Sequence, residues 1–340
     1  TVLVGTLGLG GQGVYAIDIT DPENPSVLWE FTDEADVRLG YTYGRPNVVR
    51  LSDGTWVALV PSGYNSESAI DFATRGLPNE RPDAFANTGG NSTGAVFAIN
   101  IANGAYRRID VPLARGLATV QAADYELDYK VDFVVAGDLN GDLWRIDLEG
   151  RGWSEVASAP VEVLFRGNRV TGVPQWPITT APTIYADPAT GKMVVVVGTG
   201  KYIENGDREI NIPRQAIYGI RECGRGCDRY PITEASLVQQ TLTVGPAGYL
   251  NMAQTNVVPP DRNGWFVQVG DPGLLGGALR GERIIEMSIP VSFPSGIVAI
   301  GSFIPSNDPC APLGTGAVYV LSAFTGGFPL PGDLNPLGTA

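Results

Sequence analysis

A repeated pair of short apolar segments constrains the fold of this chain more than any other feature. The first segment of each pair ends in glycine or another small residue, and the second has an aromatic residue near its centre. Apolar residues alternate within the second segments, which is typical of half-buried β-strands. Five pairs occur: 2–5 with 13–18, 56–63 with 94–99, 133–137 with 141–147, 193–198 with 215–220, and 297–301 with 316–321.

The spacing of these pairs indicates a β-propeller. Their central aromatics, Tyr15, Phe97, Trp144, Tyr218 and Tyr319, are 82, 47, 74 and 101 residues apart. These gaps suit a blade of roughly 40–50 residues in which some copies are degenerate or carry insertions. Long amphipathic helical patterns are absent. We predict an all-β fold, a modified β-propeller of about seven blades with long inter-strand loops, over residues 1–325. Residues 326–340 are expected to form a turn-rich C-terminal extension.

Glycine-containing dipeptides fall between the predicted strands. Asp53-Gly54, Asn103-Gly104 and Asn140-Gly141 are expected to form tight hairpin turns with positive φ angles. Asp138, Asn140 and Asp142 alternate in a way that also suits a metal loop, but a type I′ hairpin turn explains them better. Residues 65–93 are polar and long, and they are predicted to be a functional surface loop.

The overall composition excludes several classes of function. The chain has no histidine, which excludes Ser-His-Asp and Cys-His catalysis and His-ligated zinc or iron sites. Its formal net charge of −13 disfavours binding to nucleic acid or to an anionic membrane. The longest apolar run, near 193–197, is far shorter than the ~20 residues of a membrane helix, so no membrane span is predicted. Without a signal peptide, the chain resembles a mature fragment or an excised domain of a longer protein.

An acidic stretch at residues 124–132 is a candidate calcium loop. An EF-hand-like loop supplies oxygen ligands at positions 1, 3, 5, 7 (a backbone carbonyl) and 9. In this chain these positions are Asp124, Glu126, Asp128, the Lys130 carbonyl and Asp132. Two features depart from the pattern: Tyr129 stands where such loops use glycine, and Glu126 is longer than the usual Asp or Asn. The alternative is a solvated acidic connection between blades.

The three cysteines have different prospects. Cys223 and Cys227 flank Gly-Arg-Gly, and two sulfurs this close in sequence are candidates for a disulfide that closes a small loop in an oxidising compartment. A metal site would need further Cys or His ligands, and none is nearby. Cys310 is left over, either free or paired outside this segment.

Eight segments together resemble the C-terminal domain of the PilC/PilY family of type IV pilus biogenesis and tip-adhesin proteins. They follow the order of the family and cover most of the chain. The block AGDL-x-G-x-LW-R-x-DL is the most specific of them. The segments are GGQGVYAIDITDP (10–22), LWEFTDE (28–34), LGYTYGRP (39–46), GYNS (63–66), AGDLNGDLWRIDL (136–148), PITTAPTI (177–184), VVGTGKYI (196–203) and QAIYGI (215–220).

This resemblance implies a modified β-propeller domain of an exported, surface-displayed protein that is not an enzyme. It implies a place at the pilus tip, with minor pilins as partners and roles in pilus extension and twitching motility. Attachment to host cells or abiotic surfaces, and thereby virulence, is also implied. The resemblance further implies that the nine-residue loop before the AGDL block binds calcium, which tunes pilus extension against retraction.

Two other functions compete with this one. Quinoprotein dehydrogenases also build propellers from Gly-x-aromatic motifs and use calcium with pyrroloquinoline quinone. Their adjacent-cysteine pair and their regular tryptophan-rich repeat are missing here. A generic protein-binding propeller is the other alternative. Propellers bind partners through their inter-strand loops. The loops 65–93 and 203–214 are therefore the predicted contact sites for minor pilins or host surfaces.

Overall fold

The computed structural model is built almost entirely from short β-strands. It describes residues 1–64, 94–167, 169–170, 173–174, 176–188, 191–203, 205–244, 250–254, 256–271, 273, 279–292, 295–306 and 314–329. Within these residues the only helices are three short 3-10 turns, η1 (Val156–Ser158), η2 (Asn205–Arg208) and η3 (Glu234–Ser236). The chain divides into two compact units, Thr1–Leu139 with Leu143–Glu162, and Asn140–Asp142 with Val163–Ala340. The all-β prediction is confirmed.

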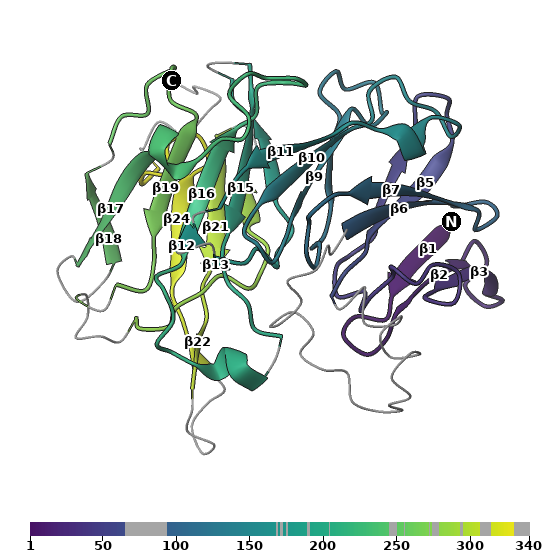
Figure 1. The fold of residues 1–340 in the computed structure, drawn as a ribbon, viewed down its shortest axis with the longest axis horizontal. Helices are drawn as coiled ribbons and strands as arrows, with labels where there is room; N and C mark the ends of the chain where they lie inside the picture. The colour runs from purple at the N-terminus through teal and green to yellow at the C-terminus, as the bar shows by residue number, and fades with distance from the viewer. Residues whose placement is uncertain are drawn as a thin grey trace. The chain divides into compact units, whose positions relative to one another are not determined.

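The first unit contains a three-stranded and a four-stranded antiparallel sheet, and most of a third sheet (Figure 1). The first sheet has the order β1-β2-β3, formed by β1 (Val2–Thr6), β2 (Gly13–Asp18) and β3 (Ser26–Thr32). The second has the order β4-β5-β6-β7, formed by β4 (Asn47–Arg50), β5 (Trp56–Pro61), β6 (Gly94–Asn100) and β7 (Tyr106–Val111). The third has the order β11-β10-β9-β8, formed by β8 (Gln121–Ala123), β9 (Phe133–Gly137), β10 (Leu143–Asp147) and β11 (Val161–Phe165), and β11 carries the chain into the second unit.

The second unit contains a larger, mixed sheet and a three-stranded sheet. The larger sheet has the order β14-β15-β16-β19-β17-β18. Its strands are β14 (Thr183–Ala186), β15 (Met193–Gly198), β16 (Ala216–Arg221), β17 (Val238–Val244), β18 (Leu250–Gln254) and β19 (Gly264–Gln268). The other sheet has the order β20-β21-β24, formed by β20 (Ile289–Ser292), β21 (Ile297–Gly301) and β24 (Val318–Ser322). Two small ribbons pair β12 (Arg169–Val170) with β13 (Val173–Pro174) and β22 (Ile304–Pro305) with β23 (Gly314–Thr315).

Each of the five predicted segment pairs forms an antiparallel strand pair, and each lies in a different sheet. The pairs are β1–β2, β5–β6, β9–β10, β15–β16 and β21–β24. Four of the five central aromatics are buried, and Tyr15 is partly exposed. The described residues therefore contain five blade-like sheets. The predicted number of about seven blades stays a prediction, as do the domain boundaries.

The glycine-containing turns are longer than expected. The strands β4–β5, β6–β7 and β9–β10 are joined by five residues each, 51–55, 101–105 and 138–142. In each connection only the glycine, Gly54, Gly104 or Gly141, has a positive φ. A type I′ turn needs positive φ at both central residues. The type I′ prediction for Asn140-Gly141 is therefore wrong, because Asn140 keeps a negative φ.

Within each unit, neighbouring sheets pack face to face through apolar side chains. In the first unit one cluster joins the first sheet (Val14, Ala16, Trp29, Phe31) to the second (Ala58, Val60, Phe97, Ile99). In the second unit another cluster joins the larger sheet (Tyr185, Val194, Ile217, Trp265) to β21 and β24 (Val298, Ile300, Tyr319, Leu321). Burying such side chains contributes roughly 1.5–3 kcal/mol each to stability. This sheet-on-sheet packing is how propeller blades share their cores.

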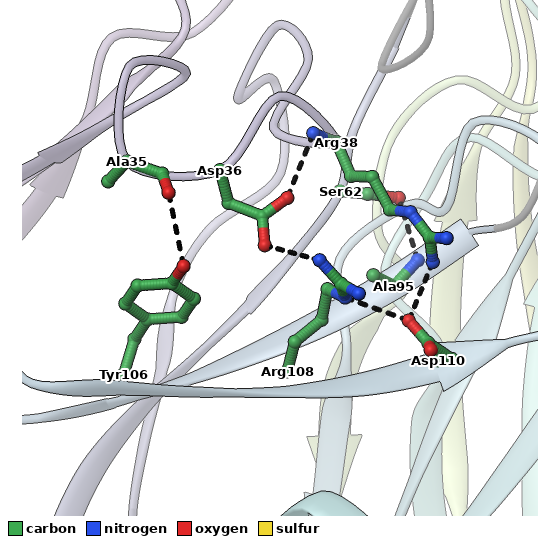
Figure 2. Close-up of polar contacts among 8 residues, drawn as sticks. All are labelled: Ala35, Asp36, Arg38, Ser62, Ala95, Tyr106, Arg108 and Asp110. Atoms are coloured by element: carbon green, nitrogen blue, oxygen red, sulfur yellow. Dashed lines mark hydrogen bonds and ion pairs between the residues drawn. The ribbon is translucent and has the colours of Figure 1, made fainter.

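An ion-pair cluster ties the loop after β3 to the outer strand β7 of the second sheet (Figure 2). The Asp36 carboxylate is nearly buried and accepts a hydrogen bond of 2.6 Å from Arg108 Nη1. Asp110 accepts hydrogen bonds from Arg108 Nε at 2.8 Å and from Arg38 Nη1 at 2.6 Å. A buried carboxylate is stable only with such partners. The cluster therefore supports the packing of the first two sheets.

Candidate functional site

The candidate calcium loop, residues 124–132, is a nine-residue connection between β8 and β9 in the third sheet. In the second sheet the corresponding connection, between β4 and β5, has only five residues, 51–55. The loop is anchored at its end, because the backbone N–H of Val131 donates to the Arg50 carbonyl at 2.9 Å. The N–H of Asp132 donates to the Ala123 carbonyl at the same distance. The acidic residues thus occupy a lengthened and well-anchored turn.

Asp124 and Asp132 organise the loop by accepting hydrogen bonds from its backbone. Asp124 Oδ1 accepts from the N–H of Asp128 at 3.1 Å, and Oδ2 accepts from the N–H of Tyr129 at 2.7 Å. Asp132 Oδ2 accepts from the N–H of Tyr125. Hydrogen bonds from backbone N–H groups to carboxylates are among the stronger ones in proteins. Both aspartates therefore hold the loop in a defined conformation.

The loop makes its tight bends without glycine. Leu127 has a φ of 59° and Tyr129 a φ of 65°. This left-handed region is unfavourable for residues with a side chain and costs on the order of 1 kcal/mol each. Tyr129 is the residue that replaces the usual glycine, and its backbone nevertheless takes the conformation that glycine would allow. Tyr129 is 84% exposed, so its ring has few neighbouring atoms that could clash with it in this conformation.

Lys130 brings a positive charge to the loop. Its Nζ lies 2.8 Å from Asp128 Oδ2, and its backbone N–H donates to Asp128 Oδ1 at 2.9 Å. These bonds, chiefly the one from the Lys130 side chain, lower the pKa of Asp128. Both side chains are substantially exposed, so the pair contributes little to stability. Glu126 is also exposed.

The loop fits a calcium ion in residue type but not in arrangement. Carboxylate and carbonyl oxygens are the ligands that Ca²⁺ prefers. Yet among the described residues no three Asp, Glu, Cys or His side chains lie close enough together to hold a metal ion. The carboxylates bond the loop's own N–H groups and Lys130 instead. The predicted calcium site therefore stays a prediction.

The second alternating set, Asp138, Asn140 and Asp142, lies in the connection between β9 and β10. Asp138 is fully buried, and its Oδ2 accepts hydrogen bonds from Trp144 Nε1 at 3.1 Å and from the N–H of Arg115 at 3.2 Å. Asp142 Oδ1 accepts from the N–H of Gly167 at 3.0 Å. These two carboxylates therefore hold neighbouring segments in place, which explains the two aspartates of the AGDLNGD block.

The predicted partner loop 203–214, described except for residue 204, is held in place by its own side chains and by its neighbours. Asp207 accepts the N–H of Ile203 at 2.8 Å, and its carboxylate lies 3.3 Å from Lys201 Nζ. At the other end Arg214 lies 3.3 Å from Asp271. Several residues between these ends are exposed, namely Gly206, Arg208, Glu209, Asn211 and Pro213. This segment thus presents a fixed polar surface to solvent.

Arg283 holds this segment by bonding backbone carbonyls in it and beside it. This role was not predicted from the sequence. Arg283 is 2% exposed. Its guanidinium donates to the carbonyls of Gly281 (3.0 Å), Lys201 (3.2 Å), Asp207 and Glu209 (2.6 Å). Burial lowers its pKa, and a guanidinium keeps its charge at any physiological pH. No sequence pattern signals this role, because the acceptors are backbone carbonyls up to 82 residues away.

Two of the three cysteines, Cys223 and Cys227, lie in the described part of the chain. The structure joins Cys223 and Cys227 in a disulfide. Beside it, Glu222 accepts hydrogen bonds from the N–H of Gly224 at 2.7 Å and from the Tyr230 hydroxyl at 3.0 Å. Cys310, the loop 65–93 and residues 330–340 lie outside the described residues.

Comparison with known proteins decides the family. The protein-family model described as the PilY1 beta-propeller domain matches residues 1–248 of this chain. The chain belongs to the PilY1 β-propeller domain family. Its resemblance to PilC/PilY proteins is thereby confirmed, as is the propeller fold class.

Curated relatives and a solved structure agree with this family. The type IV pilus biogenesis factor PilY1 of Pseudomonas aeruginosa strain PAO1 is 30% identical over 96% of the chain. A PilY1 homolog of Xylella fastidiosa is 29% identical over 96% of the chain. The chain spans only 29% and 24% of these two relatives, respectively. The crystal structure of the P. aeruginosa PilY1 C-terminal domain matches with a TM-score of 0.72 and 26% identity, covering 96% of this chain and 67% of that one.

The structure also bears on membrane spans. Among the residues that it describes, no helix has the length and apolar character needed to cross a bilayer.

Proposed function

We propose that this domain is a non-enzymatic part of a type IV pilus biogenesis factor that acts at the pilus tip. In this role it supports pilus extension, twitching motility and attachment to host or abiotic surfaces. The observation that carries the proposal is the match of the PilY1 propeller family to residues 1–248, together with the likeness to the PilY1 C-terminal domain. Its named relatives are type IV pilus biogenesis factors.

Exported tip association is tested by fractionating the encoding organism. Pili sheared from cells are purified and probed with an antibody against this domain, and intact pili are labelled with the same antibody and gold. We expect the protein in the sheared fraction, with gold at pilus ends. Detection only inside the cell, with none on sheared pili, would contradict the proposal.

The exposed surface of the segment 203–214 is the proposed contact for minor pilins. Arg283 and Asp207 bond the backbone of this segment, which lowers the cost of ordering its backbone when a partner binds. The double variant Arg208→Glu with Asn211→Arg is expected to weaken co-purification of minor pilins at least ~10-fold. Arg225→Glu, an exposed arginine in the disulfide loop, is the matched control. Equal recovery of minor pilins with both variants would exclude this surface.

We further propose that calcium binds the loop 124–132, where it would compete with Lys130 for Asp128. Titration calorimetry of the purified protein would compare wild type with Asp132→Ala and Lys130→Met. Loss of binding in Asp132→Ala and tighter binding in Lys130→Met are expected, because the methionine removes a cation held 2.8 Å from the Asp128 carboxylate. Glu149→Ala, an exposed acidic residue beyond the loop, is the control. Identical heats in all four proteins would sink the calcium assignment and leave the pilus proposal standing.

The competing quinoprotein function has a direct test. The purified protein is mixed with pyrroloquinoline quinone and calcium, and its absorption spectrum and its reduction of an artificial dye are recorded. We expect neither a bound-quinone spectrum nor dye reduction. Either signal would replace the non-enzymatic proposal with a dehydrogenase.

A further inference from the structure

Within the described residues, the first sheet has no counterpart of a strand that is present in each of the other four blade-like sheets. In those sheets a strand lies antiparallel beside the first member of the repeated pair: β4 beside β5, β8 beside β9, β14 beside β15, and β20 beside β21. In the first sheet the corresponding member is β1, and among the described residues it pairs only with β2. One long edge of β1 is therefore without a strand partner within the described part of the chain.

The hydrogen-bond register shows which groups lie along this edge. The Thr1 carbonyl accepts from the N–H of Ile19 at 2.9 Å, and the N–H of Leu7 donates to Gly13 at 3.1 Å. In an antiparallel pair, hydrogen-bonded positions alternate, so the odd-numbered residues of β1 face β2. Val2 and Val4 therefore direct their N–H and C=O groups away from β2.

Further along β1 the edge is partly covered. The Thr6 hydroxyl donates to the Gly44 carbonyl at 3.1 Å, and Gly8 forms a β-bridge with Thr42. The segment 42–44 thus lies beside the end of β1. As far as the described residues show, the open part of the edge is limited to Val2 and Val4. This is room for a short strand, comparable to the four-residue strands β4, β14 and β20.

An apolar groove of about 730 Å³ adjoins this open edge. Val2 of β1 and Val48 of β4 both line it, together with Leu28, Trp56 and Ile101. Val2, Val48 and Trp56 are 40%, 46% and 54% exposed, high values for apolar residues of strands. An unpaired strand edge beside pockets for apolar side chains is the arrangement to which an extended peptide adds as a further strand.

We propose that an extended segment of the same polypeptide, beyond these 340 residues, adds antiparallel to β1 and completes the first sheet to four strands. Its backbone would bond the N–H and C=O groups of Val2 and Val4, and an apolar side chain would enter the groove. In the four other sheets, the corresponding strand lies within residues 1–340. The chain covers 67% of the solved PilY1 domain and 29% of the PAO1 PilY1 sequence, so these relatives have polypeptide beyond the matched part.

A strand from the same polypeptide also has a physical advantage over a separate partner. Pairing of a tethered segment is intramolecular, so it avoids the translational and rotational cost of bimolecular association. Completion protects the protein as well, because open edges template pairing with other chains. The proposal does not depend on the role of the domain in the pilus.

Hydrogen exchange of the full-length protein, purified alone, tests the proposal. Mass spectrometry with fragmentation that resolves residues 2–5 compares Val4 with Leu3 and Gly5, whose N–H groups face β2. We expect Val4 to exchange as slowly as its two neighbours, with the same rates at two protein concentrations tenfold apart. Exchange of Val4 at least ~100-fold faster than that of Gly5 would overturn the proposal. Protection that appears only at the higher concentration, or only with added minor pilins, would overturn it too, because the strand would then come from another molecule.

A pair of proline variants gives an independent readout in the same full-length protein. Val2→Pro removes an N–H that the added strand would use, whereas Glu30→Pro removes one on the outer edge of β3, which the register turns away from β2. Proline is tolerated on open edges and not within a paired ladder. We expect Val2→Pro to lower the melting temperature more than Glu30→Pro and to speed the exchange of Val4. Equal, small effects of the two variants would mean that both edges are open.

Discussion

At the scale of single residues, Leu127 and Tyr129 hold a left-handed backbone that glycine usually provides. Tyr129 is almost fully exposed, so a change of its side chain acts mainly through the backbone. We expect Tyr129→Gly to raise the free energy of unfolding by about 1 kcal/mol relative to Tyr129→Ala, because alanine keeps the unfavourable φ. Urea denaturation of both variants measures the difference. An alanine variant as stable as the glycine variant would show that the loop does not hold this conformation in solution.

Asp53 makes a pH-dependent contribution to the first unit. The N–H of Trp153 donates to Asp53 at 2.7 Å and that of Thr55 at 2.9 Å, and these bonds lower the pKa of the carboxyl, the bond from Trp153 most. A carboxyl whose pKa is lower in the folded state stabilises the fold above its unfolded pKa, ~3.9. This contribution disappears as the pH falls through the lower, folded value.

The stability difference between wild type and Asp53→Asn should follow this pH dependence. We expect wild type to be the more stable at pH 7 and the difference to shrink progressively below pH ~4. Denaturant unfolding at several pH values measures it. A difference that is constant from pH 7 to pH 2.5 would contradict a role for the ionised carboxylate.

At the scale of strands, a glycine can leave space for a large side chain of the neighbouring strand to lie over it. Gly219 of β16 lies opposite Trp265 of β19, and a Cβ on Gly219 would lie 2.2 Å from the buried indole. Gly219→Ala is therefore expected to lower the free energy of unfolding by about 1–3 kcal/mol. Gly301→Ala is the matched control, since Gly301 is also a strand residue and has open space around its Cβ position. Equal effects of the two variants on thermal unfolding would refute this steric explanation.

Arg283 is predicted to act on a whole segment. Arg283→Met keeps much of the side-chain volume but leaves the carbonyls of Lys201, Asp207 and Glu209 without their donor. We expect limited proteolysis to cut within 203–214 at least ~10-fold faster than in wild type. Arg280→Met, an exposed neighbour whose contact with Asn211 is a long 3.4 Å, is the control. Unchanged cleavage in Arg283→Met would show that the segment is held by other contacts.

The strand pairs were predictable because their signal is local. Alternating apolar residues and a central aromatic identified β2, β6, β10, β16 and β24, and all five form the expected pairs. Other features depend on contacts between distant residues, which leave no local pattern. The parallel pairing of β17 with β19 is one of these, and the buried pair Asp36–Arg108, 72 residues apart, is another. Turn type was missed because a glycine at positive φ is compatible with several connection lengths.

The candidate site was predictable in its residues and not in its arrangement. The acidic residues 124–132 lie in the connection directly before β9, and their binding of calcium stays a prediction. Spacing alone cannot tell whether carboxylates converge on one point or bond the backbone, and here Asp124 and Asp132 bond N–H groups of the loop. The ion pair of the Lys130 ammonium with Asp128 could not be predicted either, because the ligand pattern uses only the backbone carbonyl of Lys130.

At the scale of the whole molecule, the PilY1 relatives are much longer than this chain. The chain spans less than a third of its PilY1 relatives, so its role has to be measured in the intact protein. The chain has no histidine, so histidine-based acid–base chemistry is excluded, and the fold class by itself does not define the function.

The most direct test of the central proposal is a count of surface pili. The coding segment for residues 1–340 is deleted in frame from the gene of the encoding organism, and pili per cell are counted by electron microscopy. Immunoblotting verifies that the shortened protein is still made and exported, and the intact gene in trans is the control. We predict a large loss of pili that the intact gene restores. Normal numbers of pili in cells that export the shortened protein would contradict it.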